Sequence, residues 1–250
     1  LPPTPEEVET FVDEMDRTNG AIKTYAKLID RLLESPHYGE RMARHWLDVV
    51  RYADSSGFAN DYERGNAWRY RDYVIDAFNS DKPFDRFIRE QIAGDLLPAA
   101  SPQERAANIT ATGFLVLGDV EIVAVDKLKM EHDLVDQQVS KIGTAFLGLT
   151  LGCVRCHDHK FDPIAQTDYY AIAGMFRSTD ATYKTDNGVW SSVHKTELPE
   201  TTEQKAGREL LLAANKEKIR HWEAERDKAN KEKAVIEPQI ASATNAARPL

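Results

Sequence analysis

Cysteine is scarce in this 250-residue chain, which contains two, and both fall within four residues of each other, at Cys153 and Cys156. A disulfide framework needs cysteines spread along the chain so that they can join distant segments, and this placement excludes one. Long apolar runs are also missing. No stretch approaches the roughly 20 apolar residues that cross a bilayer, so we expect no membrane span in this chain.

An excess of positive charge is missing as well, since 32 Lys and Arg stand against 41 Asp and Glu and the formal net charge is -9. A phosphate-binding surface needs clustered Lys and Arg, so we expect no nucleic-acid partner and favour redox partners or small molecules. The chain opens with Leu1 rather than Met, which indicates a processed protein or an excised fragment. The missing signal peptide therefore says little about the compartment.

Helix signals dominate the sequence, and period-two alternation is nearly absent, with residues 113–125 as the single strand candidate. The sequence therefore predicts an all-α fold, irregular in arrangement. The expected helices begin at Thr4 and Ser101 and otherwise cover residues 22–34, 38–53, 67–79, 84–96, 125–149 and 166–176.

The composition changes near residue 200, and residues 201–250 are rich in Lys, Glu, Ala and Arg. Their apolar seam is interrupted by Arg226 and Lys233. We predict a long, mostly solvated helical linker or extension, or one arm of a helical hairpin, which Pro238 ends or kinks. Residues 1–200 are predicted to form one helical domain.

The motif that carries chemistry is Cys153-Val154-Arg155-Cys156-His157, which has the C-x-x-C-H spacing of a c-type haem site. Two thiols three residues apart can form thioethers with both vinyl groups of one porphyrin. The following His157 can then direct its imidazole at the iron as the proximal ligand. The motif predicts one covalent haem c, and we expect the irregular helical domain to be built around it.

Three other interpretations of the two cysteines are open. A dithiol redox site normally follows a strand in a βαβ pattern, which is missing here. A structural zinc ion could use Cys153, Cys156 and two nearby histidines, although ligation by both His157 and His159 would strain a tetrahedral site. The third interpretation is a pair of ordinary buried cysteines.

The motif and its surroundings resemble a known family. Residues 153–163 read CVRCHDHKFDP, and SPHYGERMARHWLDVVRYADSSGF (35–58) and EQIAGDLLP (90–98) match as well. These stretches resemble the planctomycete-type cytochrome c-associated domain family, a domain of unknown function, over about residues 1–180. The resemblance implies a haem motif and a place in a large secreted protein, often between a cytochrome-like domain and a second domain of unknown function. It implies no substrate.

Two further residues complete the expected site. His45 is the first candidate for the sixth iron ligand, because it lies on a predicted amphipathic helix beside apolar positions. Arg155 is a candidate partner for a haem propionate, since a planar guanidinium suits a carboxylate. We also expect Gly148 and Gly152 to let a flat macrocycle approach the backbone.

The leading functional prediction is electron transfer by one haem c, with a redox protein or an attached domain as the partner. Attachment of this haem takes place outside the cytoplasm, so we expect a periplasmic or otherwise exported protein. Two alternatives remain at this point. One is a haem enzyme with an open iron site that acts on a small or carbohydrate-derived molecule. The other is a structural module of a larger enzyme, in which a zinc ion holds the helices together. The sequence does not indicate an oligomeric state.

Overall fold

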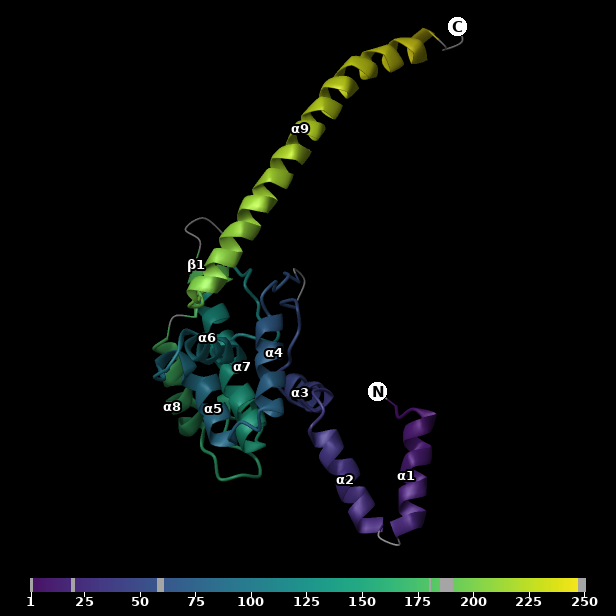
Figure 1. The fold of residues 1–250 in the computed structure, drawn as a ribbon. Coiled ribbons are helices and arrows are strands. Elements are labelled where there is room, and N and C mark those ends of the chain that lie inside the picture. Colours follow the sequence, from purple (N-terminus) through teal and green to yellow (C-terminus); the bar gives the residue numbers. More distant parts are fainter. Residues whose placement is uncertain (1, 19–20, 58–60, 180, 185–190, 247–250) are drawn as a thin grey trace. The chain divides into compact units, whose positions relative to one another are not determined.

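The computed structural model describes residues 2–18, 21–57, 61–179, 181–184 and 191–246 (Figure 1). The chain divides into two units, residues 1–198 and residues 199–250. Helices account for almost all of the regular structure, so the expected all-α fold class is confirmed. None of the helices in the described ranges combines the length and apolarity of a bilayer-crossing segment.

The first two helices, α1 (Pro5–Thr18) and α2 (Ala21–Leu33), form a hairpin. A capping box starts α1 at the predicted residue, Thr4: its Oγ1 accepts the N–H of Glu7 at 3.2 Å, and Glu7 Oε2 accepts the N–H of Thr4 at 2.8 Å. The rings of Phe11 and Tyr25 meet edge to face, with centroids 5.4 Å apart, and join the two helices.

Trp46 lies at the centre of the first hydrophobic core, which the next helices enclose. Its ring centroid is 5.0 Å from that of Phe87 and 5.8 Å from that of Phe146. The indole N–H donates to the Tyr70 hydroxyl and to Gln91 Oε1, both at 3.0 Å, so the buried donor is satisfied. The enclosing elements are α3 (His37–Val49), α4 (Trp68–Asn79), α5 (Phe84–Ala93), η1 (Gly94–Leu96), α6 (Pro102–Ala111) and η2 (Thr112–Leu115).

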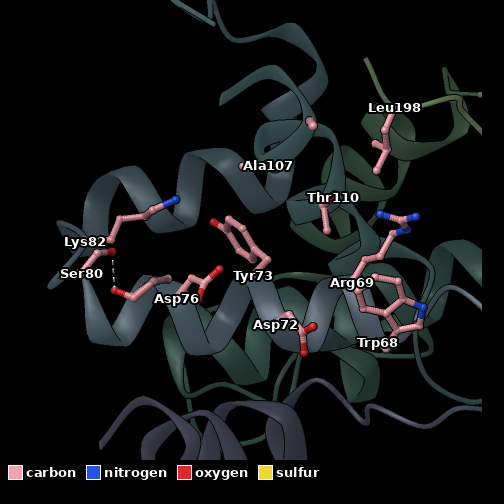
Figure 2. Close-up of a pocket in the computed structure, with 12 residues that line it drawn as sticks. Trp68, Arg69, Asp72, Tyr73, Asp76, Ser80, Lys82, Ala107, Thr110 and Leu198 are labelled. Carbon is pink, nitrogen blue, oxygen red and sulfur yellow. Dashed lines mark hydrogen bonds between the residues drawn. The ribbon is translucent and has the colours of Figure 1, made fainter. Parts of the chain in front are cut away.

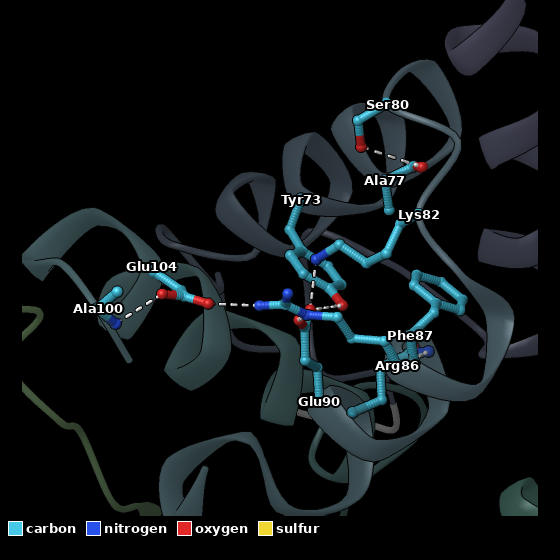
Figure 3. A network of polar contacts seen from close by, with 10 residues as sticks. Tyr73, Ala77, Ser80, Lys82, Arg86, Phe87, Glu90, Ala100 and Glu104 are labelled. Carbon is cyan, nitrogen blue, oxygen red and sulfur yellow. Dashed lines mark hydrogen bonds and ion pairs between the residues drawn. The ribbon is translucent and has the colours of Figure 1, made fainter. Parts of the chain in front are cut away.

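The carboxylate of Glu90 is fully buried beside this core (Figure 3). It accepts hydrogen bonds from Tyr73 Oη at 2.8 Å, from Arg86 Nε at 2.7 Å and from Lys82 Nζ. Burial alone would raise the pKa of Glu90, but these three donors bring it below its ordinary value. The guanidinium of Arg86 also reaches Glu104, which links α5 to α6. A buried charge is thus balanced by two cations.

Helix α3 is shorter than expected, because it ends at Val49 rather than near residue 53. Arg51 adopts a left-handed backbone, with φ at 57°. The N–H of Arg51 donates to the carbonyl of Asp48 at 3.1 Å, and the N–H of Tyr52 donates to that of Leu47 at 2.9 Å. This pair of bonds is a Schellman motif, which terminates the helix.

The expected helix over residues 125–149 is also shorter, since α7 covers Lys127–Ile142 and passes into a π-helical turn, η3 (Gly143–Leu147). A Cβ atom at Gly143 would lie 2.6 Å from Leu151 Cγ and 2.7 Å from Leu149 O. The chain therefore turns back against its own helix at this glycine. Gly148, with φ at 65°, closes the turn.

The second hydrophobic core lies between α7, the 3₁₀ turn η4 (Leu151–Arg155) and α8 (Gln166–Arg177). An antiparallel ribbon of two short strands follows, β1 (Thr182–Lys184) and β2 (Ser191–Val193), in which Thr182 pairs with Val193. The strand candidate at residues 113–125 was wrong, because that segment begins in η2 and contains a single bridge residue, Val123, rather than a strand. Its carbonyls are instead used by side chains from other elements.

The unit formed by residues 199–250 consists mainly of α9 (Thr202–Ala246), whose described side chains are exposed. Pro238 does not end this helix but lies inside it. Residues 247–250 of the expected linker lie outside the described ranges.

Candidate functional site

The two cysteines lie on or beside the 3₁₀ turn η4, and its periodicity sorts the motif into two faces. Residues three apart are aligned in a 3₁₀ helix. Leu151 and Val154 accordingly face the second core and are buried, whereas Cys153 and Cys156 are exposed free thiols. The interpretation as two ordinary buried cysteines was therefore wrong. The C-x-x-C spacing presents both thiols on the solvent side of one turn.

Arg155, between the cysteines, points to α7. Its guanidinium nitrogens Nη1 and Nη2 both lie 3.2 Å from Asp133 Oδ1, and Nη1 lies 3.4 Å from Asp136 Oδ2. Its backbone carbonyl accepts from Gln166 Nε2 at 2.9 Å and from Tyr170 Oη at 3.1 Å. The middle of the motif is thus fixed to α7 by its side chain and to α8 by its backbone.

The two aspartates on α7 were not predicted as part of the site. Burial would raise the pKa of Asp133, but hydrogen bonds from Lys129 and Arg155 lower it below its ordinary value. Asp136 accepts from Tyr169 Oη at 2.5 Å, and burial together with this bond raises the pKa of the Tyr169 phenol. The available signal was their spacing of three on a predicted helix, which does not say what they face.

His157 is exposed, and its ring has a defined tautomer. Nδ1 lies 2.7 Å from the carbonyl oxygen of Asp158. A carbonyl only accepts, so Nδ1 carries the proton and donates. In the neutral ring the lone pair then belongs to Nε2. A backbone carbonyl that holds Nδ1–H in this way prepares the other nitrogen of a histidine for a metal.

His159 and Asp158 hold the loop that follows the motif. The His159 ring is buried, with Nε2 at 3.0 Å from Thr150 Oγ1 and Nδ1 at 3.0 Å from the N–H of Asp162. Asp158 Oδ1 accepts the N–H of Gln166 at 2.8 Å at the start of α8. Both ring nitrogens of His159 therefore have partners within the loop.

Comparison with known proteins identifies the family of the chain. The family model PSCyt2, described as a protein of unknown function (DUF1549), matches residues 1–181. The chain belongs to the PSCyt2 family. No curated protein and no solved structure matches it. The match ends just after α8, so the whole cysteine motif and its α7 and α8 anchors lie within the PSCyt2 region.

The donor set of the PSCyt2 domain fits a haem c in its chemistry. Such a group needs two accessible thiols and an imidazole with a free Nε2, and Cys153, Cys156 and His157 supply these. A zinc site needs converging donors. In the part of the chain that the structure describes, no three His, Cys, Asp or Glu side chains converge as a metal-binding group.

The remaining predicted site residues lie elsewhere or have other contacts. His45 is exposed on α3, which packs on α4, whereas η4 packs on α7 and α8. A Cβ at Gly152 would lie 2.5 Å from Ser140 Oγ, so this glycine serves the contact with α7. Gly148 has nothing within 4 Å of its Cβ position. Ligation by His45 and a propionate contact of Arg155 stay predictions.

A cavity of about 300 Å³ lies between α4 and α6 of the PSCyt2 domain, away from the motif (Figure 2). Tyr73 and Ala107 line it, with Asp72 and Asp76 on α4 and Lys82 at one end. A second cavity of about 330 Å³ lies between α7 and the end of α8 and includes His132. Neither cavity is lined by the cysteines or by His157.

Proposed function

We propose that this PSCyt2 domain is a c-type cytochrome module that binds one haem c through Cys153 and Cys156, with His157 as an axial ligand. The observation that carries the proposal is the exposure of both thiols on one face of η4 beside a histidine whose Nε2 is free. When bound, the haem would supply one-electron transfer at its iron.

The attachment is an addition and releases nothing. Each thiol adds across one vinyl group, so that a carbon–sulfur bond forms, the vinyl double bond becomes single, and the thiol hydrogen passes to the neighbouring carbon. Both thiols must be reduced for this step. The role of the chain is to present them, and Arg155 fixes the turn for that purpose through Asp133 and Asp136.

We infer an exported location from the same chemistry, since this kind of haem is attached outside the cytoplasm. Electrons would pass to a redox partner protein or to an attached domain. The second axial ligand is proposed to be His45, whose exposed ring on α3 is available.

The attachment is tested by producing the chain in cells competent in cytochrome c maturation. We expect the denatured protein to exceed the polypeptide mass by one haem, to keep it through acid-acetone extraction, and to give a pyridine haemochrome spectrum of the c type. Replacing Cys153 or Cys156 with Ser should leave one thioether and shift that spectrum, and replacing both should abolish attachment. A bare polypeptide mass with stoichiometric zinc would establish the structural zinc module instead.

The ligation state separates a carrier from an enzyme. A low-spin iron in the wild type that becomes high-spin and binds carbon monoxide in His45→Ala would support ligation by His157 and His45. His132→Ala is the matched control, because His132 lies in the second cavity and should leave the spectrum unchanged. A high-spin wild type would contradict the carrier and favour a haem enzyme with an open site.

A further inference from the structure

Gly118 lies where the side chains of three basic residues, Arg51, Arg64 and Lys141, approach one turn. Its φ of 103° is a conformation that only glycine adopts readily. A Cβ atom there would lie 3.6 Å from Arg51 Cβ and 3.8 Å from Lys141 Nζ. Arg64 Nη2 donates to the carbonyl of Gly118 at 2.7 Å. Two basic residues from the segment between α3 and α4 and one from α7 therefore approach one turn.

The side chains of Arg51, Arg64 and Lys141 donate their hydrogen bonds to neutral acceptors. Lys141 is buried, and its Nζ donates to the carbonyls of Phe114 (2.7 Å) and Leu117. The contact of Arg51 is a long one, 3.4 Å from Nη1 to Gln137 Oε1. Carbonyl and amide oxygens satisfy hydrogen bonds but carry no charge that balances a cation.

The positive charge is not compensated by carboxylates. Among the described residues, none of Arg51, Arg64 and Lys141 forms an ion pair with Asp or Glu. Asp119 is the carboxylate whose charge raises the pKa of Arg64, against the larger effect of burial. Below the pKa of Lys141, which burial lowers to about 7, three cations and one carboxylate leave two positive charges over. A buried cation without a counter-charge, such as Lys141, is costly and ordinarily has a partner.

Donor groups remain at the same place. Arg64 Nη1 is buried and has no hydrogen-bond partner among the described residues. Lys141 Nζ has three hydrogens and two carbonyl acceptors. Such donors around an excess charge match the several acceptor oxygens of an oxyanion.

The backbone conformation of Arg51 supports a binding role independently of the charges and donors. It occupies the left-handed position of a Schellman motif, where glycine is the ordinary residue because a Cβ is strained there. Strain held at a charged residue points to a role for its side chain. We propose that Arg51, Arg64 and Lys141 form a binding site for a tetrahedral dianion, phosphate or sulfate, at the Gly118 turn.

The test measures the melting temperature of the full chain against sulfate or phosphate at pH 6 and constant ionic strength, with chloride as the balancing anion. We expect a saturable rise in the wild type, because a ligand that binds only the folded state stabilises it by mass action. The dissociation constant for sulfate should increase at least tenfold in Arg51→Gln, and the rise should vanish in Arg51→Gln combined with Arg64→Gln. Arg89→Gln, an exposed arginine of α5, is the matched control and should respond like the wild type.

Each outcome decides the proposal. Sulfate also stabilises proteins by exclusion from their surface, but that effect is linear in concentration and would be equal in all variants. A linear rise, or an unchanged dissociation constant in Arg51→Gln, would overturn the site. Equal affinity for acetate and sulfate would overturn the assignment to a tetrahedral dianion. If the double variant fails to fold, Arg51→Gln decides alone, since its side chain is exposed.

Discussion

The guanidinium of Arg155 contacts Oδ1 of Asp133 with both of its Nη atoms at 3.2 Å, so the residue between the two cysteines is bound to α7. The pair is partly exposed, 36% for Arg155 and 33% for Asp133, which limits its strength through solvent screening.

We expect Arg155→Gln and Asp133→Asn each to lower the free energy of unfolding by about 1 kcal/mol, because each removes one partner of the same pair. A double-mutant cycle in urea should give a coupling of about 0.5–1 kcal/mol. The more exposed pair Arg89 and Asp85 is the control and should give a smaller coupling. Strict additivity at Arg155 and Asp133 would mean that the contact contributes nothing.

Two glycines in neighbouring elements should respond to alanine in opposite directions. Gly143→Ala introduces a Cβ at 2.6 Å from Leu151 and should cost about 1–3 kcal/mol through overpacking. Gly174→Ala, in α8 with open space around it, should stabilise by about 0.5–1 kcal/mol through helix propensity. Urea unfolding measures both, and a shift of the same sign in the two variants would contradict the close approach at Gly143.

Glu90→Gln should destabilise the first core by about 3–5 kcal/mol at neutral pH, because it leaves Lys82 and Arg86 without their buried counter-charge. The pKa of Glu90 is lowered in the folded state, so its contribution is present above the ordinary carboxyl range and is lost as the pH falls through the folded pKa. The difference between variant and wild type should therefore shrink in acid. Glu104→Gln, at the solvent end of the network, is the control and should have a much smaller effect.

Lys141 should make stability rise with pH in buffers without phosphate or sulfate. Burial, and then the charges of Arg64 and Arg51, lower the pKa of Lys141 to about 7 from 10.5. Between these values the unfolded chain keeps a proton that the folded chain has lost, so the free energy of unfolding increases with pH. The rise should be on the order of a few kcal/mol and absent in Lys141→Met. Parallel pH profiles for the two proteins would show that the amine is not desolvated.

Removal of residues 201–250 should leave the first unit folded, because the described side chains of α9 are exposed. Far-ultraviolet circular dichroism should lose helical signal, while the near-ultraviolet spectrum from Trp46 and its aromatic neighbours should persist. Loss of the near-ultraviolet signal would show that the first core depends on α9.

The sequence predicted the helices well where a periodic apolar stripe determined them, and it failed where a contact across the chain decided. The stripe of α7 gives no warning that Gly143 must accommodate Leu151. The glycine-favouring conformation at Arg51 contradicts the local preference of its residue type, so no pattern could place the end of α3 there.

In the candidate site, too, local spacing could be predicted from the sequence, whereas contacts between distant segments could not. Spacing alone singled out Cys153, Cys156 and His157, because two thiols three residues apart share a face of a tight turn. The pairing of Arg155 with Asp133 and Asp136 depends on how η4 packs on α7. Periodicity within either segment does not contain that information.

The outward placement of Cys153 and Cys156 has a consequence for the order of events in biogenesis. Both hydrophobic cores are closed by side chains of the polypeptide itself, and neither includes a cysteine. Folding and the proposed haem addition would therefore be separable steps, and the haem would be added to the surface of an already folded domain. With the exported location proposed above, the two neighbouring thiols would be exposed during that interval to oxidants outside the cytoplasm. Maturation of this module would then depend on two competing reactions. A reductant would keep Cys153 and Cys156 as thiols, and a dithiol oxidase would join them in a disulfide.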